Sequence, residues 1–496
     1  MFRNQYLVVT DKIHSNFQEI DPTYFHGLYI YVQSYTNTSV AKHLETELFL
    51  IGYIIDPQHP GYSNEEIIND IVQNCPTEKL FFQKIQILSG RYVLIYKNRT
   101  FFIVTGDACN LRQIYFEVSN NRTVLTSSVK MFLTYYEYEP KISQLKKDFI
   151  NEPIIYKERE PAWYGNKSID DRLYKLLPNH YLDLSKKVVK RIPLYSPTGF
   201  LNEDDIIDFV SMMLKGTFAS LVKRHKLIQG LTAGLDTRIL LAAAKEFKND
   251  IQFYVFNHND LPPDPPNVWV SQRLAQKLKL NYKVIKPDEV RPEFLQEYVK
   301  EHIVPRILPK ISHLQYFKEH YSDPNIINVS GNASAMSKCH YGYTNQKISL
   351  EMLLFFSGYH VSKNPFVKQE LEEWLTDVSP YAEEYGISVL DLFYWEQRQG
   401  NWGALQSFEK DLVIEEVCPF NNTSIHTSLL QVKPSRRASP NYVFFRKLLQ
   451  SLEPETLSEP INPYNNKLQG VVKKLRGIIK RHPYLKYSMY QLGNFR

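Results

Sequence analysis

The sequence predicts two consecutive folds: an α+β domain built as a sandwich of β-strands, then an α/β domain with a parallel, doubly wound sheet. A chain of 496 residues is too long for one compact core. Up to about residue 195, short apolar runs are separated by tight turns, as in hairpins. From about residue 200, short β-branched runs alternate with single helices, as in a parallel sheet.

Hairpins account for most of the first part. The run ELFLIGYII at 47–55 is rich in strand-forming residues, and 90–107 contains two apolar strands around a tight turn. Another strand pair is expected within 112–128. One helix is expected at 64–75, where apolar residues recur at helical spacing.

The second part alternates between helices and strands. In order, it is expected to contain a helix at 201–225, a strand at 226–231, a helix at 236–247, a strand at 251–256, a helix at 267–279, and strands at 282–286 and 325–330. The stretch PLYSP before residue 198 is typical of a linker. We therefore predict domains at 1–195 and 196–472, followed by a basic tail at 473–496.

Composition and charge exclude several classes of protein. Hydrophobic residues make up 43% and charged residues 23%, as in soluble globular proteins. The net charge of +6 is small and is not gathered into one stripe, so no nucleic-acid partner is expected. No apolar run approaches the roughly 18 to 20 residues that span a bilayer. The first residues carry charges where a signal peptide needs an apolar core, so we expect a cytoplasmic protein.

The cysteines and the tail carry no evident chemistry. Four cysteines are far apart and form no CxxC pair, which argues against a disulfide framework or structural zinc: Cys75, Cys109, Cys339 and Cys418. The tail is basic and amphipathic, with Lys473, Lys474, Arg476, Lys480, Arg481 and Lys486. We interpret it as a solvated helix face rather than a membrane or nucleic-acid contact.

The most distinctive strand end is the loop GLTAGLDTR at 230–238. In an open parallel sheet, ligands bind at the carboxyl ends of the strands. The small residues Gly230, Ala233 and Gly234 let backbone N–H groups come close to an anion. The helix that follows adds its free N–H groups and the positive end of its dipole. The loop is therefore a candidate phosphate site.

Three side chains strengthen this interpretation. Thr232 and Thr237 offer hydroxyl donors, and Asp236 can hold Mg²⁺ against phosphates. The loop lacks the GK[ST] ending of a Walker A motif, so it is not the loop of kinases and ATPases. The alternative is a glycine-containing turn with Asp236 as a helix N-cap.

LTAGLDTR resembles the SGGLDSR pyrophosphate loop of asparagine synthetase and its relatives, with the first glycine replaced by Ala233. Segments in the same order resemble other parts of that family, between about residues 45 and 465: SGRYVLIY, GDACNLRQIYF and LTSSVKMF within 89–132, YGNKSIDDRLYKLLPNHYLDL at 164–184, FYWEQRQGNW at 393–402, and RKLLQSLEPETLSEPINP at 446–463.

This resemblance implies a glutaminase-like (Ntn-type) first domain and a second domain of the ATP-pyrophosphatase type. It implies ATP and Mg²⁺ as cofactors. A substrate carboxylate would attack the α-phosphate of ATP and release pyrophosphate, and an amine would capture the acyl-adenylate to give an amide. Such chemistry depends on positioning and charge stabilisation.

The resemblance also assigns residues. The pyrophosphate would be held by Gly230, Thr232, Ala233, Gly234, Asp236 and Thr237. Asp236 would be the metal ligand, and Val255 and Asn257 would lie beside adenine, by position only. The family uses a late lysine to stabilise the adenylate transition state. Lys467 is the best candidate by position and Lys447 is second, with a surface lysine as the alternative for each.

The first departure from the family concerns glutamine. Members that use glutamine begin the mature chain with a cysteine, whose amine and thiol act together. Here the second residue is Phe2, and the first cysteine is Cys75. We therefore predict no glutaminase activity. β-Lactam synthetases and lasso-peptide cyclases share this pattern and take the amine from the substrate itself; free ammonia or a separate donor protein are other options.

The second departure lies at 330–335. SGNASA resembles the family's SGEGAD loop, which supplies a carboxylate near the substrate and a second metal-binding aspartate. We therefore expect Ser330, Gly331 and Asn332 to contact substrate, but Asn332 and Ala335 stand where the acids would be. Either Asp236 holds Mg²⁺ with other groups, or the site is weakened.

Two charged pairs have structural explanations. Glu396 and Arg398 either form an ion pair that supports the substrate pocket or lie on a helix surface, since residues two apart do not face each other on a helix. Asp107 and Arg112 are expected to stabilise a hairpin bend, because the cysteine that they would have served is missing.

Three functions remain open. The first is an active ATP-dependent amidoligase that acts on a small-molecule or peptide carboxylate and an amine donor. The second is a non-catalytic scaffold or regulator that keeps nucleotide binding. The third is another pyrophosphate-loop enzyme, of the thiolation or argininosuccinate type, which the hairpin-rich first domain opposes. The sequence identifies neither substrate, and a homodimer stays open.

Overall fold

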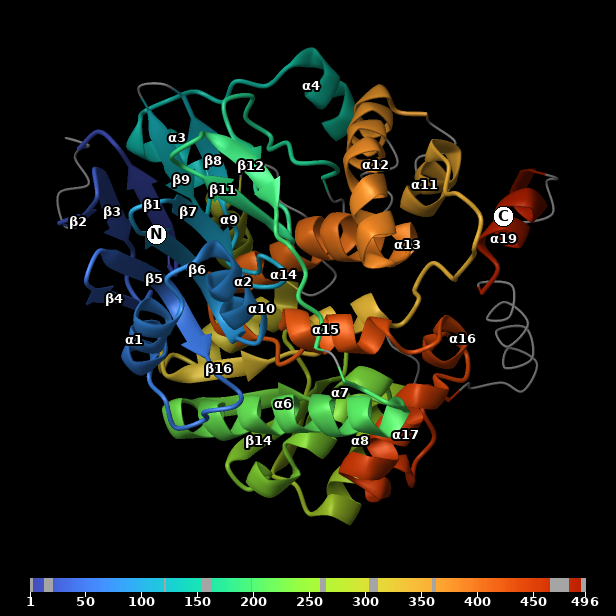
Figure 1. Cartoon of the computed structure of the whole chain (residues 1–496). Helices are drawn as coiled ribbons and strands as arrows, with labels where there is room; N and C mark the ends of the chain where they lie inside the picture. Colours follow the sequence, from blue (N-terminus) through green and yellow to red (C-terminus); the bar gives the residue numbers. More distant parts are fainter. Residues whose placement is uncertain are drawn as a thin grey trace.

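The computed structural model describes residues 3–12, 21–119, 122–152, 163–197, 199–258, 265–302, 311–358, 363–463 and 481–491. Two antiparallel sheets form the first half of the chain, and one parallel sheet with its helices forms the second half (Figure 1).

The first half is a sandwich of two six-stranded sheets. One has the order β10-β8-β9-β1-β3-β2 and the other β12-β11-β7-β6-β5-β4, with antiparallel neighbours throughout. Their bounds are β1 Tyr6–Val9, β2 Thr23–Phe25, β3 Leu28–Val32, β4 Thr38–His43, β5 Thr46–Ile55, β6 Ser89–Lys97, β7 Phe102–Gly106, β8 Tyr115–Val118, β9 Thr123–Thr126, β10 Tyr174–Lys175, β11 His180–Asp183 and β12 Val188–Arg191. The hairpins expected from the sequence are confirmed.

Apolar residues of alternating strand positions fill the space between the two sheets, among them Val8, Ile51 and Val104. The opposite face of the second sheet is covered by α1 (Asn64–Asn74) and α2 (Glu78–Gln86). The outer face of the first sheet is covered by α3 (Val129–Tyr135), and α4 (Gln144–Ile150) follows it. Helix α1 was predicted and α2 was not.

The second half contains a five-stranded sheet of order β15-β14-β13-β16-β17, in which every pair is parallel. The strands are β13 Lys226–Gly230, β14 Ile251–Phe256, β15 Tyr282–Ile285, β16 Ile326–Val329 and β17 Glu415–Val417. The four predicted strands are confirmed. The fifth strand was missed because it has only three residues and two of them are acids. Both acids are buried, and hydrogen bonds from polar side chains stabilise them there.

Helices cover both faces of this sheet, so the predicted doubly wound arrangement is confirmed. Leu227 packs with the core of α6, α7 and α17, while Ile228 packs on the opposite face with α9 and α10. The helices are α6 Glu203–Arg224, α7 Leu235–Ala243, α8 Pro266–Leu278, α9 Pro292–Glu301, α10 Ile311–His320, α11 Leu350–Ser357, α12 Pro365–Tyr385, α13 Val389–Leu392, α14 Ala404–Lys410, α15 Thr423–Leu430, α16 Pro434–Arg437, α17 Val443–Leu452 and α19 Pro483–Gln491. Short turns are η1 Lys245–Phe247, η2 Asn332–Ser337 and η4 Pro454–Leu457, and η3 (Phe393–Gly403) is a π-helix.

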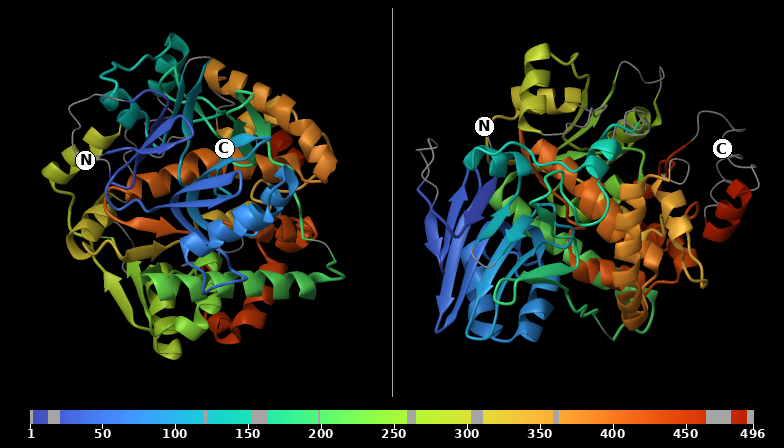
Figure 2. Two further views of the ribbon diagram at one scale, coloured as in Figure 1. Left: turned by 60° about the vertical axis from the view of Figure 1, so that its left-hand side comes forward. Right: turned by 90° about the horizontal axis from the view of Figure 1, so that it is seen from above.

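The two halves share one apolar core. Tyr53 and Leu111 of the first half lie in the same buried cluster as Phe218 and Trp395 of the second. In the right-hand view of Figure 2, the blue strands of the first half lie on the left of the molecule, and the orange helices of the second half lie in its middle and to the right. The division at residues 195 and 196 stays a prediction.

The cysteines and the longer helices bear on two expectations for the whole chain. Each of the four cysteines is free and buried, as expected from their spacing. Within the described ranges, none of the helices combines the length and the apolar character needed to cross a membrane.

Candidate functional site

The loop between β13 and α7 is held together by its own hydroxyl groups. The N–H of Thr232 donates to Oγ1 of Thr237 at 3.1 Å, and the N–H of Gly234 donates to Oγ1 of Thr232 at 3.1 Å. The two hydroxyl oxygens are themselves 3.1 Å apart. The hydroxyl groups of Thr232 and Thr237 therefore fix the conformation of the loop.

Helix α7 begins without a side-chain cap. Its N-cap residue is Gly234, which has no side chain that could accept a hydrogen bond from the first turn. Asp236 lies inside this first turn, so the alternative in which Asp236 is the N-cap is wrong. The first N–H groups of a helix have no partner within the helix, and they carry the positive end of its dipole. This helix end can accept an anion.

A cavity of about 350 Å³ lies at this helix end. It is lined by Gly234, Leu235, Asp236, Ala335, Lys338, Cys339, His340, Ala438, Ser439, Tyr442, Asn462 and Arg481. Its walls come from the α7 end, the η2 turn, the start of α17 and two late segments of the chain. The cavity thus lies beside the carboxyl ends of the parallel strands, where such a sheet binds ligands.

Lys338 is the residue that sequence reasoning missed. It follows η2, it is 7% exposed, and its Nζ forms an ion pair with Oδ1 of Asp236. Burial lowers the pKa of Lys338 to about 7. One signal was present in the sequence: a lysine follows Ala335 by three residues, in a stretch where the resemblance implied acids and the chain has neutral residues.

Only part of the predicted site lines the cavity. Gly234 and Asp236 do so, whereas the cavity lining does not include Gly230, Thr232, Ala233, Thr237, Val255, Asn257, Ser330, Gly331 or Asn332. Val255 is buried within β14, and the N–H of Asn257 donates to the carbonyl of Ile285 at 2.8 Å.

The two candidate lysines have different outcomes. Lys467 lies outside the described residues, and its role stays a prediction. Lys447 pairs with Asp204 at 2.6 Å, and both side chains are largely exposed. Lys447 is therefore a surface lysine away from the cavity.

The loop at 330–335 packs against the start of α7. A Cβ atom on Gly331 would lie 3.0 Å from Cβ of Asp236, so glycine permits this close approach. The amide of Asn332 donates to the carbonyl of Gly403 at 3.1 Å, which joins this loop to the π-helix. Ala335 lines the cavity and presents only a methyl group there.

The donors in the cavity do not fit a Mg²⁺ site. Mg²⁺ prefers several oxygen ligands, usually carboxylates with phosphates and water. Among the described lining residues, Asp236 supplies the only carboxylate, and a lysine already pairs with it. In the part of the chain that the structure describes, no three His, Cys, Asp or Glu side chains are grouped so that they could hold a metal. The implied Mg²⁺ therefore has no protein site among these residues.

One late segment of the chain, residues 456–463, forms part of the cavity wall. Arg238 donates to the carbonyls of Thr456 and Glu459, at 3.1 and 2.6 Å, and the N–H of Asn462 donates to the carbonyl of Ala233 at 3.0 Å. These contacts hold residues 456–463 against the loop at 230–238.

The described part of the tail is not a free helix face. The N–H of Tyr343 donates to the carbonyl of Arg481 at 3.1 Å, and Nζ of Lys486 lies 4.9 Å from the ring centre of Phe355. Arg481 also donates through Nε to the carbonyl of Ser439 at 2.5 Å. Residues 481–491 therefore pack on the second half of the chain, and Arg481 borders the cavity.

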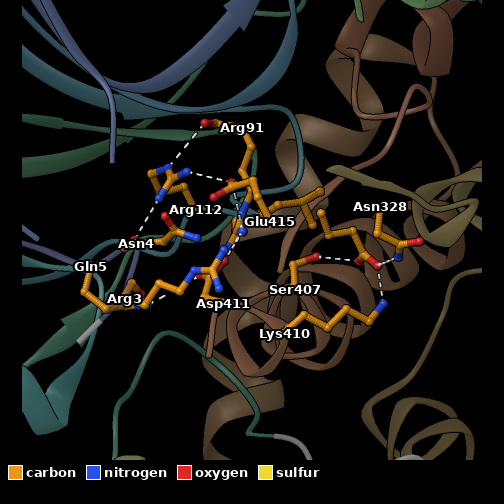
Figure 3. A network of polar contacts seen from close by, with 12 residues as sticks. Arg3, Asn4, Gln5, Arg91, Arg112, Asn328, Ser407, Lys410, Asp411 and Glu415 are labelled. Atoms are coloured by element: carbon orange, nitrogen blue, oxygen red, sulfur yellow. Dashed lines mark hydrogen bonds and ion pairs between the residues drawn. The ribbon is translucent and has the colours of Figure 1, made fainter. Parts of the chain in front are cut away.

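A buried ionic network lies between the start of the chain and β17 (Figure 3). Arg91 binds Asp411 with both terminal nitrogens and lies 3.1 Å from Glu415, to which Arg112 donates at 2.8 Å. Arg112 also donates to the carbonyl of Asn4 at 2.9 Å. Burial raises the pKa of Asp411 to about 6, against the opposing effect of Arg91. The side chain of Arg112 thus joins the two halves.

Asp107 makes a similar connection. Its carboxylate accepts a hydrogen bond from the backbone N–H of Arg112 at 3.2 Å. This bond stabilises the bend between the two residues, as the sequence predicted. The carboxylate also accepts from the side-chain amide of Asn421 at 2.7 Å. Asp107 therefore stabilises the bend in the first half and also binds Asn421 of the second half.

Glu396 is not on a helix surface. It is fully buried and binds Arg191 of the first half at 2.7 Å, while the indole of Trp374 donates to it at 2.8 Å. Arg398 instead stacks over the ring of Trp402, 4.2 Å from its centre. The two residues do not pair with each other, and Glu396 contributes to the contact between the halves.

No family model matches the sequence, and no curated protein matches it. Solved structures similar to this chain include an NH3-dependent NAD synthetase from Campylobacter jejuni, at 14% identity over 40% of this chain and 92% of that one, with a TM-score of 0.23. A glutamine phosphoribosylpyrophosphate amidotransferase from B. subtilis has 11% identity over 68% and 71%, and a TM-score of 0.22. A U34-tRNA thiolase from Methanococcus maripaludis has 11% identity over 61% and 83%, and a TM-score of 0.24. These likenesses are too distant to indicate an activity.

Proposed function

We propose that the chain is an ATP-dependent amide-forming ligase that adenylates a substrate carboxylate for capture by an amine, without glutaminase activity of its own. Its partners in this proposal are a small-molecule or peptide carboxylate and an amine donor. The observation that carries the proposal is the cavity at the uncapped start of α7, bordered by Lys338 and Arg481.

Charge and shape support a phosphate-bearing ligand. The described lining of the cavity contains one carboxylate, which Lys338 neutralises, while Arg481 and the positive end of α7 remain to attract an anion. The resemblance of residues 231–238 to a pyrophosphate loop points to the same ligand. Bound there, a triphosphate would have its leaving group stabilised by fixed positive charge, which is how such sites promote transfer.

The first test is substrate-dependent exchange of labelled pyrophosphate into ATP, measured with a panel of carboxylates. We expect exchange with one class of carboxylate and its loss in Asp236→Ala. The matched control is Asp323→Ala, which removes a carboxylate paired with Lys226 on the surface. Absence of ATP and pyrophosphate binding in the unchanged protein would refute the proposal.

The second test concerns glutamine. Two residues near the start of the chain make contacts with the second half. Arg3 donates to the carbonyl of Val413 at 2.5 Å, and the side-chain amide of Gln5 donates to Asp411 at 3.4 Å. The cavity beside Arg3 and Asn4 measures only about 30 Å³. We expect no glutamate release from glutamine, and measurable release by pure protein would contradict this part of the proposal.

A catalytically degenerate scaffold that retains nucleotide binding is the second candidate. The observation in its favour is the Asp236–Lys338 ion pair, together with the neutral residues Asn332 and Ala335 at the positions of the family's acids. ATP binding that depends on Asp236, without exchange on any carboxylate, would favour it over the active ligase.

A further inference from the structure

We propose that Lys338 takes the place of a divalent cation at the phosphate site, so that this chain binds the pyrophosphate part of a nucleotide without a metal ion held by Asp236. The inference rests on the proposed function, because it concerns the same cavity. It starts from the misfit between an implied Mg²⁺ and the donors that are present.

The first step is the position of the lysine. Its Nζ pairs with Oδ1 of Asp236, in the first turn of α7, and lies 3.5 Å from Oγ of Ser334. Its Nζ also lies 5.5 Å from the ring centre of Phe445 and 5.9 Å from that of Tyr442. Aromatic faces favour a cation at such distances. The ammonium is thus fixed on the carboxylate that a metal would need.

The second step concerns Asn332 and Ala335, the positions at which further metal ligands would be expected. Ala335 lines the cavity without a side-chain oxygen, and the amide nitrogen of Asn332 is used by the carbonyl of Gly403. A carboxylate already paired with an ammonium is a poor metal ligand, because the metal must displace the ammonium or sit beside a like charge. Neutral residues at these positions and the ammonium of Lys338 both make the site more positive, so fixed positive charge stands where a metal ion would otherwise supply it.

The third step is what the ammonium can do for a ligand. Lysine is a compact charge with three donors, of which one is directed to Asp236. A second donates to Oγ of Ser334 at 3.5 Å, and the third can donate to a phosphate oxygen in the cavity that Lys338 lines. The α7 N-terminus lines the same cavity and adds backbone donors. A phosphate would thus meet fixed positive charge without recruiting a metal.

The experiment is calorimetric titration of the full chain with ATP, and separately with inorganic pyrophosphate, in buffer containing Mg²⁺ and in buffer containing EDTA. We expect the dissociation constant of the unchanged protein to differ less than about threefold between the two buffers. Lys338→Met should weaken binding in EDTA by about tenfold or more, as loss of a charge-assisted hydrogen bond predicts. Lys338→Arg should retain most of the binding.

Two further variants keep the result interpretable. Lys338→Met alone leaves Asp236 without its partner, so the double variant Asp236→Asn with Lys338→Met removes both charges together. We expect the double variant to fold, as judged by thermal unfolding, and to remain weak in EDTA. Lys226→Met is the matched control, since it breaks a lysine–carboxylate pair with Asp323 on the surface; its binding should be unchanged.

Three outcomes are decisive. Binding that survives EDTA and depends on Lys338 supports the inference. Binding that EDTA abolishes and that Lys338→Met leaves unchanged overturns the inference while leaving the proposed function intact. If neither ATP nor pyrophosphate binds the unchanged protein in either buffer, the proposed function and the inference both fail.

Discussion

Arg238, the last residue of the loop at 230–238, shows how a side chain can support the cavity by binding backbone carbonyls. It is fully buried, and its guanidinium donates to carbonyls in residues 456–460, the segment that precedes Asn462 in the cavity wall. Burial lowers the pKa of Arg238 to about 10, which still leaves it charged at neutral pH. Arg238 therefore holds the late segment in place and belongs to the support of the cavity.

We predict that Arg238→Met lowers the free energy of unfolding by about 2–4 kcal/mol, because it leaves several buried carbonyls without a donor. Urea-induced unfolding measures this. Arg238→Lys should recover little, since an ammonium cannot reproduce the fork of donors. The control is Arg446→Met, which removes one exposed hydrogen bond to the carbonyl of Asn441. Equal effects of Arg238→Met and Arg446→Met would refute the prediction.

At this scale, the sequence pointed to the loop at 230–238 as a candidate phosphate site, which stays a prediction, but did not point to Lys338, the lysine that pairs with Asp236. Gly234 and Asp236 were predicted because residue types in a strand–loop–helix segment act locally. Lys338 is about a hundred residues away in the chain, and its position depends on how η2 folds back onto α7. Val255 and Asn257 were placed by position alone, and neither lines the cavity.

Among the elements, helix α12 shows how closely the first half approaches the second. A Cβ atom on Gly165 would overlap Oε2 of Glu370, which belongs to this helix. Gly165 also has φ of +68°, which other residues rarely adopt, so glycine is required twice over. Burial raises the pKa of Glu370 to about 7, against weaker opposing effects of Lys167 and Lys146.

This pKa makes a pH-dependent prediction for α12. Since the pKa of Glu370 is higher in the folded than in the unfolded chain, folding favours the protonated form. The cost of ionising it is absent below about pH 4.5, grows as pH rises, and is complete above about pH 7. Glu370→Gln should therefore raise the free energy of unfolding at pH 8 by about 3 kcal/mol.

The measurement is urea-induced unfolding of both proteins at pH 4.5 and pH 8. The stabilisation should disappear at the lower pH, where the cost of ionising the glutamate is absent. Glu372→Gln is the control on the same helix, since this side chain is exposed and does not contribute to the pKa shift of Glu370. A gain that is the same at both pH values would show that the effect is not due to ionisation.

The elements themselves were largely predictable, with informative exceptions. Strands β5 to β9 and β13 to β16 were predicted from their apolar runs, whereas β1 to β4 and β10 to β12 were not. Strand β17 was also missed, because its sequence is EEV and its acids are buried only through polar partners. The segment at 393–403 forms a π-helix, whose wider turn alters which residues face each other. Periodicity analysis assumes 3.6 residues per turn, so it could not separate Glu396 from Arg398.

On the scale of the whole molecule, the two halves form one body. They share an apolar core, and two buried ionic groups join them: Arg91 and Arg112 with Asp411 and Glu415, and Arg191 with Glu396. The sequence predicted two parts from their different textures. It could not predict their union, because the contacting residues are scattered and only the fold brings them together.

We predict a single transition in differential scanning calorimetry, with equal calorimetric and van't Hoff enthalpies. Arg191→Met should keep the single transition and lower the free energy of unfolding by about 3 kcal/mol, because Glu396 would lose its buried counter-charge. Lys226→Met breaks an exposed pair with Asp323 and should cost less than about 1 kcal/mol. Two resolved transitions in the unchanged protein would contradict a common core.

The buried arginines of the first half also limit how this gene can recombine. A chimera that joins residues 199–491 to the first half of another protein would lack Arg91 and Arg112, and Asp411 and Glu415 would then be enclosed without counter-charges. Such a chimera should be insoluble unless the donor supplies two arginines at matching places, or both acids are replaced by neutral residues. The two halves are therefore expected to be inherited together, whether or not the first half has any chemistry of its own.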